Sequence, residues 1–148
     1  QRWYDQSIGK RKMQDVITPV TVLKQSLELE RHVAKLDVFR MDKQGLQEYI
    51  LGLLTDDTIE KLHSFGEADT NRQIINVLLS AVKPLPLAYT KPVITQLKKL
   101  AGKDESAHVL SDEFIRRHER KSRREKYTLL TIIIITSILC LLIYFVSR

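Results

Sequence analysis

The 148-residue sequence contains one cysteine, five glycines and four prolines. A single cysteine excludes an internal disulfide and every zinc site that takes two or more thiolates from this chain. So few glycines and prolines exclude collagen-like and linker-dominated architectures. Because the five glycines stand apart from one another, the sequence also has no glycine-rich loop of the kind that holds phosphates.

The spacings that catalytic and metal sites require are missing as well. The four histidines are scattered and none forms a His-x-x-x-His pair: His32, His63, His108 and His118. Asp56 and Asp57 follow a threonine, which is ordinary chemistry for the start of a helix. Cys140 lies in an apolar segment, where a thiol stays protonated and is a poor nucleophile. We therefore predict a non-enzymatic protein with no cofactor, no metal and no small-molecule substrate.

The positive charge of the chain is concentrated in one short segment. The formal net charge is +6, but residues 1–115 carry 16 basic and 16 acidic side chains and are neutral overall. Residues 116–126 (RRHERKSRREK) contain two glutamates and seven basic side chains: Arg116, Arg117, Arg120, Lys121, Arg123, Arg124 and Lys126. The excess charge thus directly precedes the most apolar part of the sequence.

Residues 127–146 (YTLLTIIIITSILCLLIYFV) contain no charged residue. At about 1.5 Å per residue, a helix over this segment is about 30 Å long, which matches the hydrocarbon core of a bilayer. Backbone polar groups cannot stay unpaired in lipid, so a single span must be helical. We predict a transmembrane helix here, with apolar anchors in its middle and aromatic rings near the interfaces: Tyr127, Leu129, Ile133, Leu139 and Tyr144.

The basic residues on the N-terminal side of this span predict its orientation. By the positive-inside rule, residues 1–126 face the cytosol or nucleoplasm. Residues 1–30 contain no apolar stretch of the length that a secretory signal needs. This pattern is typical of a tail-anchored, single-pass protein of the endoplasmic reticulum, the nuclear envelope or the mitochondrial outer membrane.

The basic segment 116–126 itself has two interpretations. It can fix topology and bind anionic lipids, at about 1 kcal/mol for each Lys or Arg near the leaflet. It can also be a nuclear-import or nucleic-acid patch, which would have to lie away from the bilayer. Its position next to the span favours the first interpretation, so we expect no nucleic-acid partner.

The remaining sequence predicts an all-α bundle of five or six short helices over residues 16–115. Thr18-Pro19, Asp42, and Thr55 or Asp56 have the chemistry of helix starts, and Phe65-Gly66 that of a helix end. Asp69 or Thr70 opens a helix whose apolar stripe is regular, and Lys83-Pro84-Leu85-Pro86 breaks it. Thr90 and Asp104 are expected to cap the last two helices, with Gly102 between them.

The expected core follows from these stripes. Its members are Val22, Leu29, Val33, Leu36, Leu46, Tyr49, Ile50, Leu53, Leu54, Ile59, Leu62, Ile74, Ile75, Leu78, Leu79, Val82, Ile94, Leu97, Leu100, Ala107, Leu110, Phe114 and Ile115. No alternating run long enough for a sheet is present. Residues 1–15 are basic and lack periodicity, which indicates an N-terminal arm that is flexible or serves as a docking segment.

From residue 72 onward the sequence resembles the N-terminal domain of the transcription elongation factor TFIIS. The resemblance is carried by IINVLLSAVKPLP (74–86), KPVITQLKKL (91–100), AGKDESA (101–107) and HVLSDEFIRRHER (108–120). Two positions depart from the family pattern. Lys91-Pro92 replaces an Ile-Gly step, and Arg117-His118 stands where the family often has a tryptophan. The resemblance implies a helical docking module that binds short peptides of other transcription proteins in grooves between its helices.

Two functions are compatible with these features. The first is a membrane-tethered helical adaptor that binds a protein partner, a short peptide or a helix, in a groove; its expected contact residues are Tyr89, Lys98, Lys99 and Arg116. The second is an elongation-type docking module that acts in the nucleus.

Overall fold

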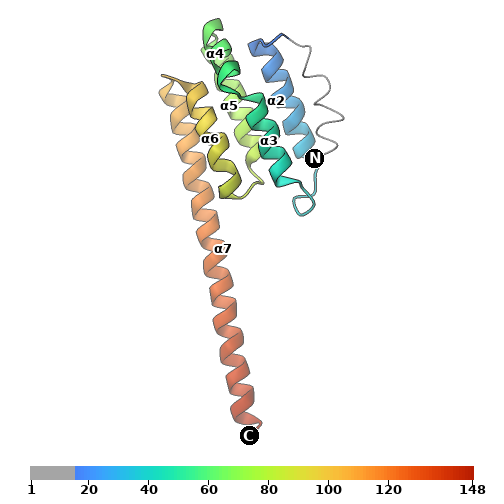
Figure 1. The fold of residues 1–148 in the computed structure, drawn as a ribbon. Helices are drawn as coiled ribbons and strands as arrows, with labels where there is room; N and C mark the ends of the chain where they lie inside the picture. Colours follow the sequence, from blue (N-terminus) through green and yellow to red (C-terminus); the bar gives the residue numbers. More distant parts are fainter. Residues whose placement is uncertain (1–15) are drawn as a thin grey trace. The chain divides into compact units, whose positions relative to one another are not determined.

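The computed structural model describes residues 16–148, and these residues form helices joined by short loops (Figure 1). The N-terminal arm predicted over residues 1–15 lies outside the described part. The helices are α2 (Pro19–Val33), α3 (Lys43–Leu53), α4 (Asp56–Phe65), α5 (Ala68–Val82), α6 (Leu87–Ala101) and α7 (Glu105–Val146). The described chain contains no strand, so the all-α prediction is confirmed.

Three of the predicted helix starts are confirmed in atomic detail. The side chains of Thr18, Asp42 and Thr55 each accept a hydrogen bond from the backbone N–H three residues later. Such bonds satisfy donors that the first turn of a helix leaves free. Gly66 ends α4 with a φ of 68°, a left-handed conformation that favours glycine, as the Phe65-Gly66 step predicted.

Two predicted helix starts are wrong. Helix α5 begins at Ala68, before Asp69 and Thr70, and its N-cap residue Glu67 makes no capping hydrogen bond. Helix α6 begins at Leu87, so Thr90 is not a cap; it is fully buried and donates its hydroxyl to the carbonyl of Leu87 at 2.9 Å. Each of these first turns contains a buried residue, Asn71 in α5 and Thr90 in α6, so packing within the bundle stabilises a turn that lacks a capping side chain.

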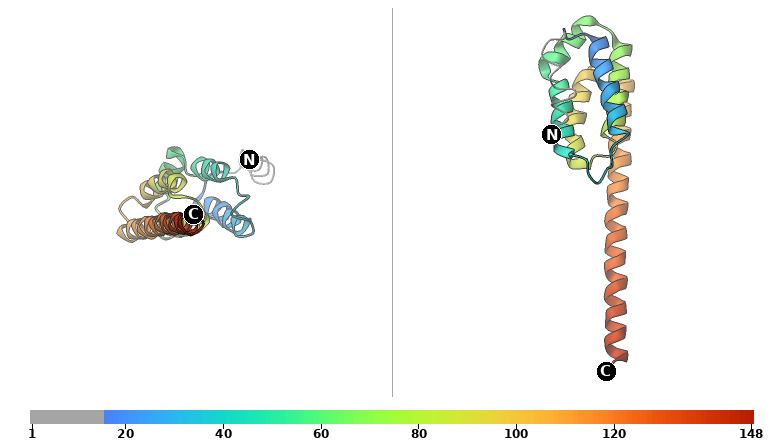
Figure 2. Two further views of the ribbon diagram at one scale, coloured as in Figure 1. Left: turned by 90° about the horizontal axis from the view of Figure 1, so that it is seen from below. Right: turned by 90° about the vertical axis from the view of Figure 1, so that its right-hand side faces the viewer.

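The helices up to Phe114 pack as a bundle. Contacts pair α2 with α5 and α3 with α6, and contacts between α5 and α6 join the two pairs (Figure 2). The apolar stripes meet in the middle of this bundle, and its fully buried large side chains include Leu29, Leu46, Ile50, Leu78 and Leu97. Val93 and Leu85 join the core as well, although the stripes did not include them.

Some predicted core residues lie nearer the surface. Leu36 follows the end of α2 at Val33, and Leu110, Phe114 and Ile115 are only half-buried. Two serines, Ser26 and Ser111, are fully buried in the interior. Each donates its hydroxyl to the backbone carbonyl four residues earlier, that of Val22 and that of Ala107. This local hydrogen bond removes the cost of burying a hydroxyl.

Helix α7 is continuous over 42 residues. The described chain divides into two compact units, one that ends at Phe114 and one formed by Ile115–Arg148. The sixth bundle helix, the basic segment and the apolar segment are therefore parts of one helix.

Candidate functional site

A cavity of about 480 Å³ opens at one end of the first unit. The end of α4, the first turn of α5, the end of α6 and the loop before α7 surround it. Its lining combines apolar and polar groups: His63, Gly66, Ala68, Asn71, Arg72, Ile75, Leu100, Ala101, Gly102, Lys103 and Asp104. This size and mixture are typical of a site that holds a few side chains or a small ligand. We call it the end cavity.

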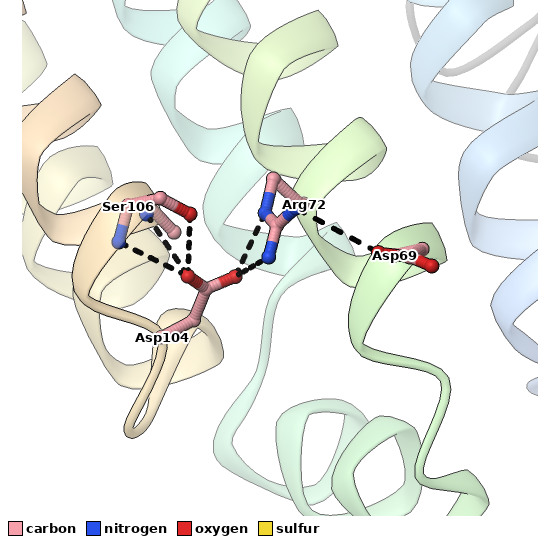
Figure 3. Close-up of polar contacts among 5 residues, drawn as sticks. Asp69, Arg72, Asp104 and Ser106 are labelled. Atoms are coloured by element: carbon pink, nitrogen blue, oxygen red, sulfur yellow. Dashed lines mark hydrogen bonds and ion pairs between the residues drawn. The ribbon is translucent and has the colours of Figure 1, made fainter.

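An ion pair lies at the edge of the end cavity. Arg72 of α5 donates from Nε to Oδ2 of Asp104 at 2.9 Å, and its Nη2 lies 2.9 Å from the same oxygen (Figure 3). Asp69, on the other side of Arg72, is more distant, with Nη1 to Oδ1 at 3.7 Å. The Arg72 side chain therefore links the start of α5 to the residue that precedes α7.

The carboxylate of Asp104 has a second set of donors. Its Oδ1 accepts hydrogen bonds from Oγ of Ser106 at 2.6 Å, from N of Ser106 at 3.1 Å and from N of Ala107 at 3.4 Å. The Ser106 hydroxyl and the Arg72 guanidinium lower the pKa of Asp104 to about 2, because both bind its charged form. Asp104 thus caps α7, as predicted, and also forms the ion pair with α5.

Asn71 gives the end cavity an unused acceptor. Its side chain is 8% exposed, and Oδ1 is buried without a hydrogen-bond partner among the described residues. The adjacent first turn of α5 has no capping side chain. Since buried polar groups are nearly always paired, this corner of the fold can accept a hydrogen bond from a further donor.

Two histidines hold the C-terminal end of α6. The ring Nε2 of His63 donates to the carbonyl of Leu100 at 2.9 Å, and Nε2 of His108 donates to the carbonyl of Gly102 at 2.8 Å. These carbonyls belong to the last turn and the cap of α6, which lack partners within the helix. His63 and His108 therefore bind backbone carbonyls from the surface of the bundle, a role that their scattered spacing in the sequence did not indicate.

The expected partner-binding residues do not gather in this cavity. Lys98 Nζ lies 2.6 Å from Oδ1 of Asp112 in α7, and Lys99 Nζ lies 3.0 Å from Oδ1 of Asp56 in α4. Tyr89 accepts a hydrogen bond at its carbonyl from Nε2 of Gln47 in α3, at 3.2 Å. All three residues of α6 thus connect it to other helices. Arg116 is exposed in the second unit.

The end cavity could not be predicted from the sequence, because it forms from four separated stretches of chain. The sequence predicts Asp104 only as a helix cap, and it gives no sign that Asn71 or Arg72 lines a cavity. The sequence contained a partial signal for the burial of Asn71. This polar residue lies one helical turn before Ile75, on the same inward face of α5 as the apolar stripe. Nothing in the spacing of Arg72 and Asp104 indicates that they meet.

The second unit has a different surface. Its apolar side chains are exposed along α7, from Leu129 at 61% to Val146 at 87%, and the anchors Ile133 and Leu139 are 60% and 54% exposed. This part of α7 is long and apolar enough to cross a membrane, and no part of the 18-residue apolar window is buried. The hydroxyls of Thr131, Thr136 and Ser137 bind carbonyls four residues earlier, so they add no unpaired donor to the apolar surface.

Within residues 16–148, no three His, Cys, Asp or Glu side chains are grouped so that they could hold a metal ion. No family model matches the chain, and neither the curated proteins nor the solved structures give a significant match. The resemblance to the TFIIS N-terminal domain therefore stays a prediction.

Proposed function

We propose that this protein is a non-enzymatic helical adaptor that is anchored in a membrane by α7 and binds a protein partner through its bundle. The observation that carries the proposal is the exposed apolar surface of residues 129–146, none of which is buried against the rest of the chain. Such a surface in water would cost about 25 cal/mol for each Å² of apolar area, whereas a bilayer removes that cost. Soluble proteins rarely leave so long an apolar stretch uncovered.

The basic segment supports an orientation with the bundle in the cytosol. Seven Lys and Arg residues lie within residues 116–126, immediately before the apolar stretch. Positive residues next to a span are retained on the cytosolic side. The endoplasmic reticulum, the nuclear envelope and the mitochondrial outer membrane all satisfy this arrangement.

The end cavity is the partner site that we propose for the bundle. Its apolar floor includes Ile75 and Leu100, and Asn71 supplies a buried acceptor without a partner. An extended peptide or the end of a helix brings both apolar side chains and backbone N–H donors to such a site. The cavity thus accounts for the partner better than Tyr89, Lys98 and Lys99, which connect α6 to other helices.

Extraction of membranes with alkaline carbonate tests the anchor. We expect the full-length chain to remain in the membrane pellet, while a peripheral protein in the same sample is released. Recovery of the chain in the soluble fraction would show that α7 does not span a bilayer, and the adaptor would then lose its anchor.

Cross-linking in native membranes tests the partner site with matched variants. Ala68→Trp and Lys103→Glu change exposed residues that line the end cavity. Lys91→Glu is the control, because it adds the same acidic side chain at an exposed position of α6 that does not line the cavity. We expect the two cavity variants to lose the cross-linked partner and the control to keep it. Equal loss in all three variants would remove the end cavity from the proposal.

A second candidate is a docking module of the TFIIS N-terminal type that acts in the nucleus. Its support is the order of helices from Arg72 onward: a Leu-rich helix, a Leu85-Pro86 step, a second helix, a short charged turn and a third helix. The same cross-linking experiment separates the candidates, because elongation factors among the captured proteins favour the docking module and organelle receptors or tethers favour the adaptor.

A further inference from the structure

The basic segment of α7 contains a hollow on its surface. This hollow measures about 470 Å³ and is lined by Arg117, Arg120, Lys121, Arg123, Arg124 and Tyr127. All six residues are exposed. Five of them are cations and none is an anion, so the hollow is a concentrated positive site rather than part of a mixed surface.

The helical spacing explains why the cations gather. At about 100° per residue, the six lining residues fall within about 160° of the helix surface. Glu119 and Glu125, the two acidic residues of the segment, fall about 40° outside this arc on either side. In the described chain no carboxylate forms an ion pair with Arg120, Lys121, Arg123 or Arg124. The cationic groups of these four residues are therefore available to a ligand.

The residue types favour phosphate as the ligand. Four of the five cations are arginines, whose planar guanidinium groups bind phosphate oxygens in pairs. A phosphate monoester carries a charge of about −1.5 to −2 near neutral pH, so two of them offset most of the charge of the hollow. Phosphatidylserine offers one net negative charge for each lipid, and it matches the hollow less well.

The position of the hollow indicates a lipid headgroup. Arg117 lies ten residues before Tyr127, which corresponds to about 15 Å along the helix. Tyr127 begins the uncharged segment that we place in the membrane, and tyrosine prefers the interface. The cations therefore start at the interface and continue above it, where the ring phosphates of an inositol lipid project beyond the other headgroups.

We infer that the hollow formed by Arg117, Arg120, Lys121, Arg123, Arg124 and Tyr127 binds the headgroup of a polyphosphorylated inositol lipid in the same membrane. This inference rests on the proposed anchoring of α7. It adds that the adaptor selects membranes rich in such lipids, beyond the general attraction of basic residues for anionic leaflets.

Native mass spectrometry of the full chain in mixed micelles tests the inference. The micelles hold phosphatidylinositol bisphosphate and phosphatidylserine at equal total charge, and the spectrum counts the lipids that stay bound to each chain. We expect the inositol lipid to be retained several-fold over phosphatidylserine. Equal retention of the two lipids would overturn the inference, because it would reduce the hollow to a site of general attraction.

Two charge-matched double variants test the site itself. Arg120→Gln with Arg124→Gln removes two cations from the hollow. Arg116→Gln with Lys126→Gln removes two cations that do not line it, at nearly the same mean position along the helix. We expect the first pair to lose the preference for the inositol lipid and the second pair to keep it. Equal effects of both pairs would mean that only net charge matters.

Competitors identify the source of the phosphates. Soluble inositol trisphosphate should displace the lipid only weakly, since it lacks the acyl chains; displacement at equal concentration would assign the hollow to free phosphates. Displacement by a short DNA duplex at equal phosphate concentration would assign it to nucleic acid. Either result would overturn the lipid assignment. Carbonate extraction measures the membrane anchor separately, so failure of the inference can be distinguished from failure of the anchor.

Discussion

Nη2 of Arg72 lies 2.9 Å from Oδ2 of Asp104, and this pair joins the N-terminal part of α5 to the cap of α7 (Figure 3). The two residues are separated by 32 positions in the sequence. Because Asp104 also accepts hydrogen bonds from Ser106 and Ala107, one carboxylate fixes both the start of α7 and its attachment to the bundle. This end of the bundle is where the end cavity lies.

Replacement of Asp104 by Asn should lower the thermal stability of the bundle. The amide keeps part of the cap but loses the charged hydrogen bonds with Arg72 and Ser106. Asp69→Asn is the control, because its carboxylate is 92% exposed and lies 3.7 Å from Arg72. Thermal melts of the full chain in non-ionic micelles, followed by circular dichroism, should show a clear decrease for Asp104→Asn and little change for Asp69→Asn. Equal melting temperatures would show that the pair contributes nothing.

The same carboxylate should make stability depend on pH in the acid range. The pKa of Asp104 is about 2 in the folded chain and 3.8 ordinarily, so the contribution is complete above the ordinary value and is lost as the pH falls toward 2. Melting temperatures of the wild-type chain should therefore fall more steeply between about pH 4 and pH 2 than those of Asp104→Asn. Parallel curves for the two proteins would assign the acid sensitivity to other carboxylates.

Leu78→Ala should destabilise the bundle by about 2–5 kcal/mol, because it removes a large side chain from a packed interior and leaves a cavity. Leu78 is 0% exposed in the middle of α5. Val20→Ala is the control, since Val20 is 67% exposed and should change stability by less than about 0.5 kcal/mol. Unfolding of the full chain by denaturant measures both values, and a loss for Leu78→Ala as small as that of the control would contradict the assigned core.

Much of the fold could be predicted because its information is local. Thr18, Asp42 and Thr55 cap the helices that follow them, and Gly66 and Gly102 end helices, all through contacts within a few residues. The apolar stripe of α5 also repeats with the helical period, so its buried face could be identified from spacing alone. The apolar end of α7 is the strongest local signal in the chain.

The start of α6 and the end cavity could not be predicted in this way. Thr90 has the chemistry of a cap, but packing of the preceding turn extends α6 back to Leu87. Arg72 and Asp104 come together only because α5 and α6 pack against each other in antiparallel fashion. The partners of Lys98 and Lys99 likewise lie on other helices, so exposure could not be judged from the sequence.

Gly45→Ala should be more harmful than a normal Gly-to-Ala change in a helix. In an ordinary helix this replacement stabilises by about 1 kcal/mol. Here a Cβ on Gly45 would overlap the carboxylate of Asp42, whose Oδ1 accepts the capping hydrogen bond from N of Gly45 at 2.9 Å. The side chain of Asp42 must move and the cap is weakened, which costs about 0.5–2 kcal/mol.

The double variant isolates this effect. In an Asp42→Ala background there is no carboxylate to displace, so Gly45→Ala should regain its usual stabilising effect. Denaturant unfolding of the four proteins gives the coupling between the two positions. Purely additive changes would mean that Asp42 adopts another rotamer without loss.

Arginine in the middle of the apolar segment should prevent membrane insertion. Ile133 and Leu139 are exposed along α7 in the segment that lacks charged residues. Each central arginine costs about 2.5–3.5 kcal/mol on insertion scales, so Ile133→Arg together with Leu139→Arg should release the chain into the carbonate-soluble fraction. The matched control is Ile133→Leu with Leu139→Ile, which changes the same positions, keeps them apolar and should stay in the pellet. If the arginine variant also stays in the pellet, residues 127–146 do not cross the bilayer, and the chain is retained by another contact such as the basic segment.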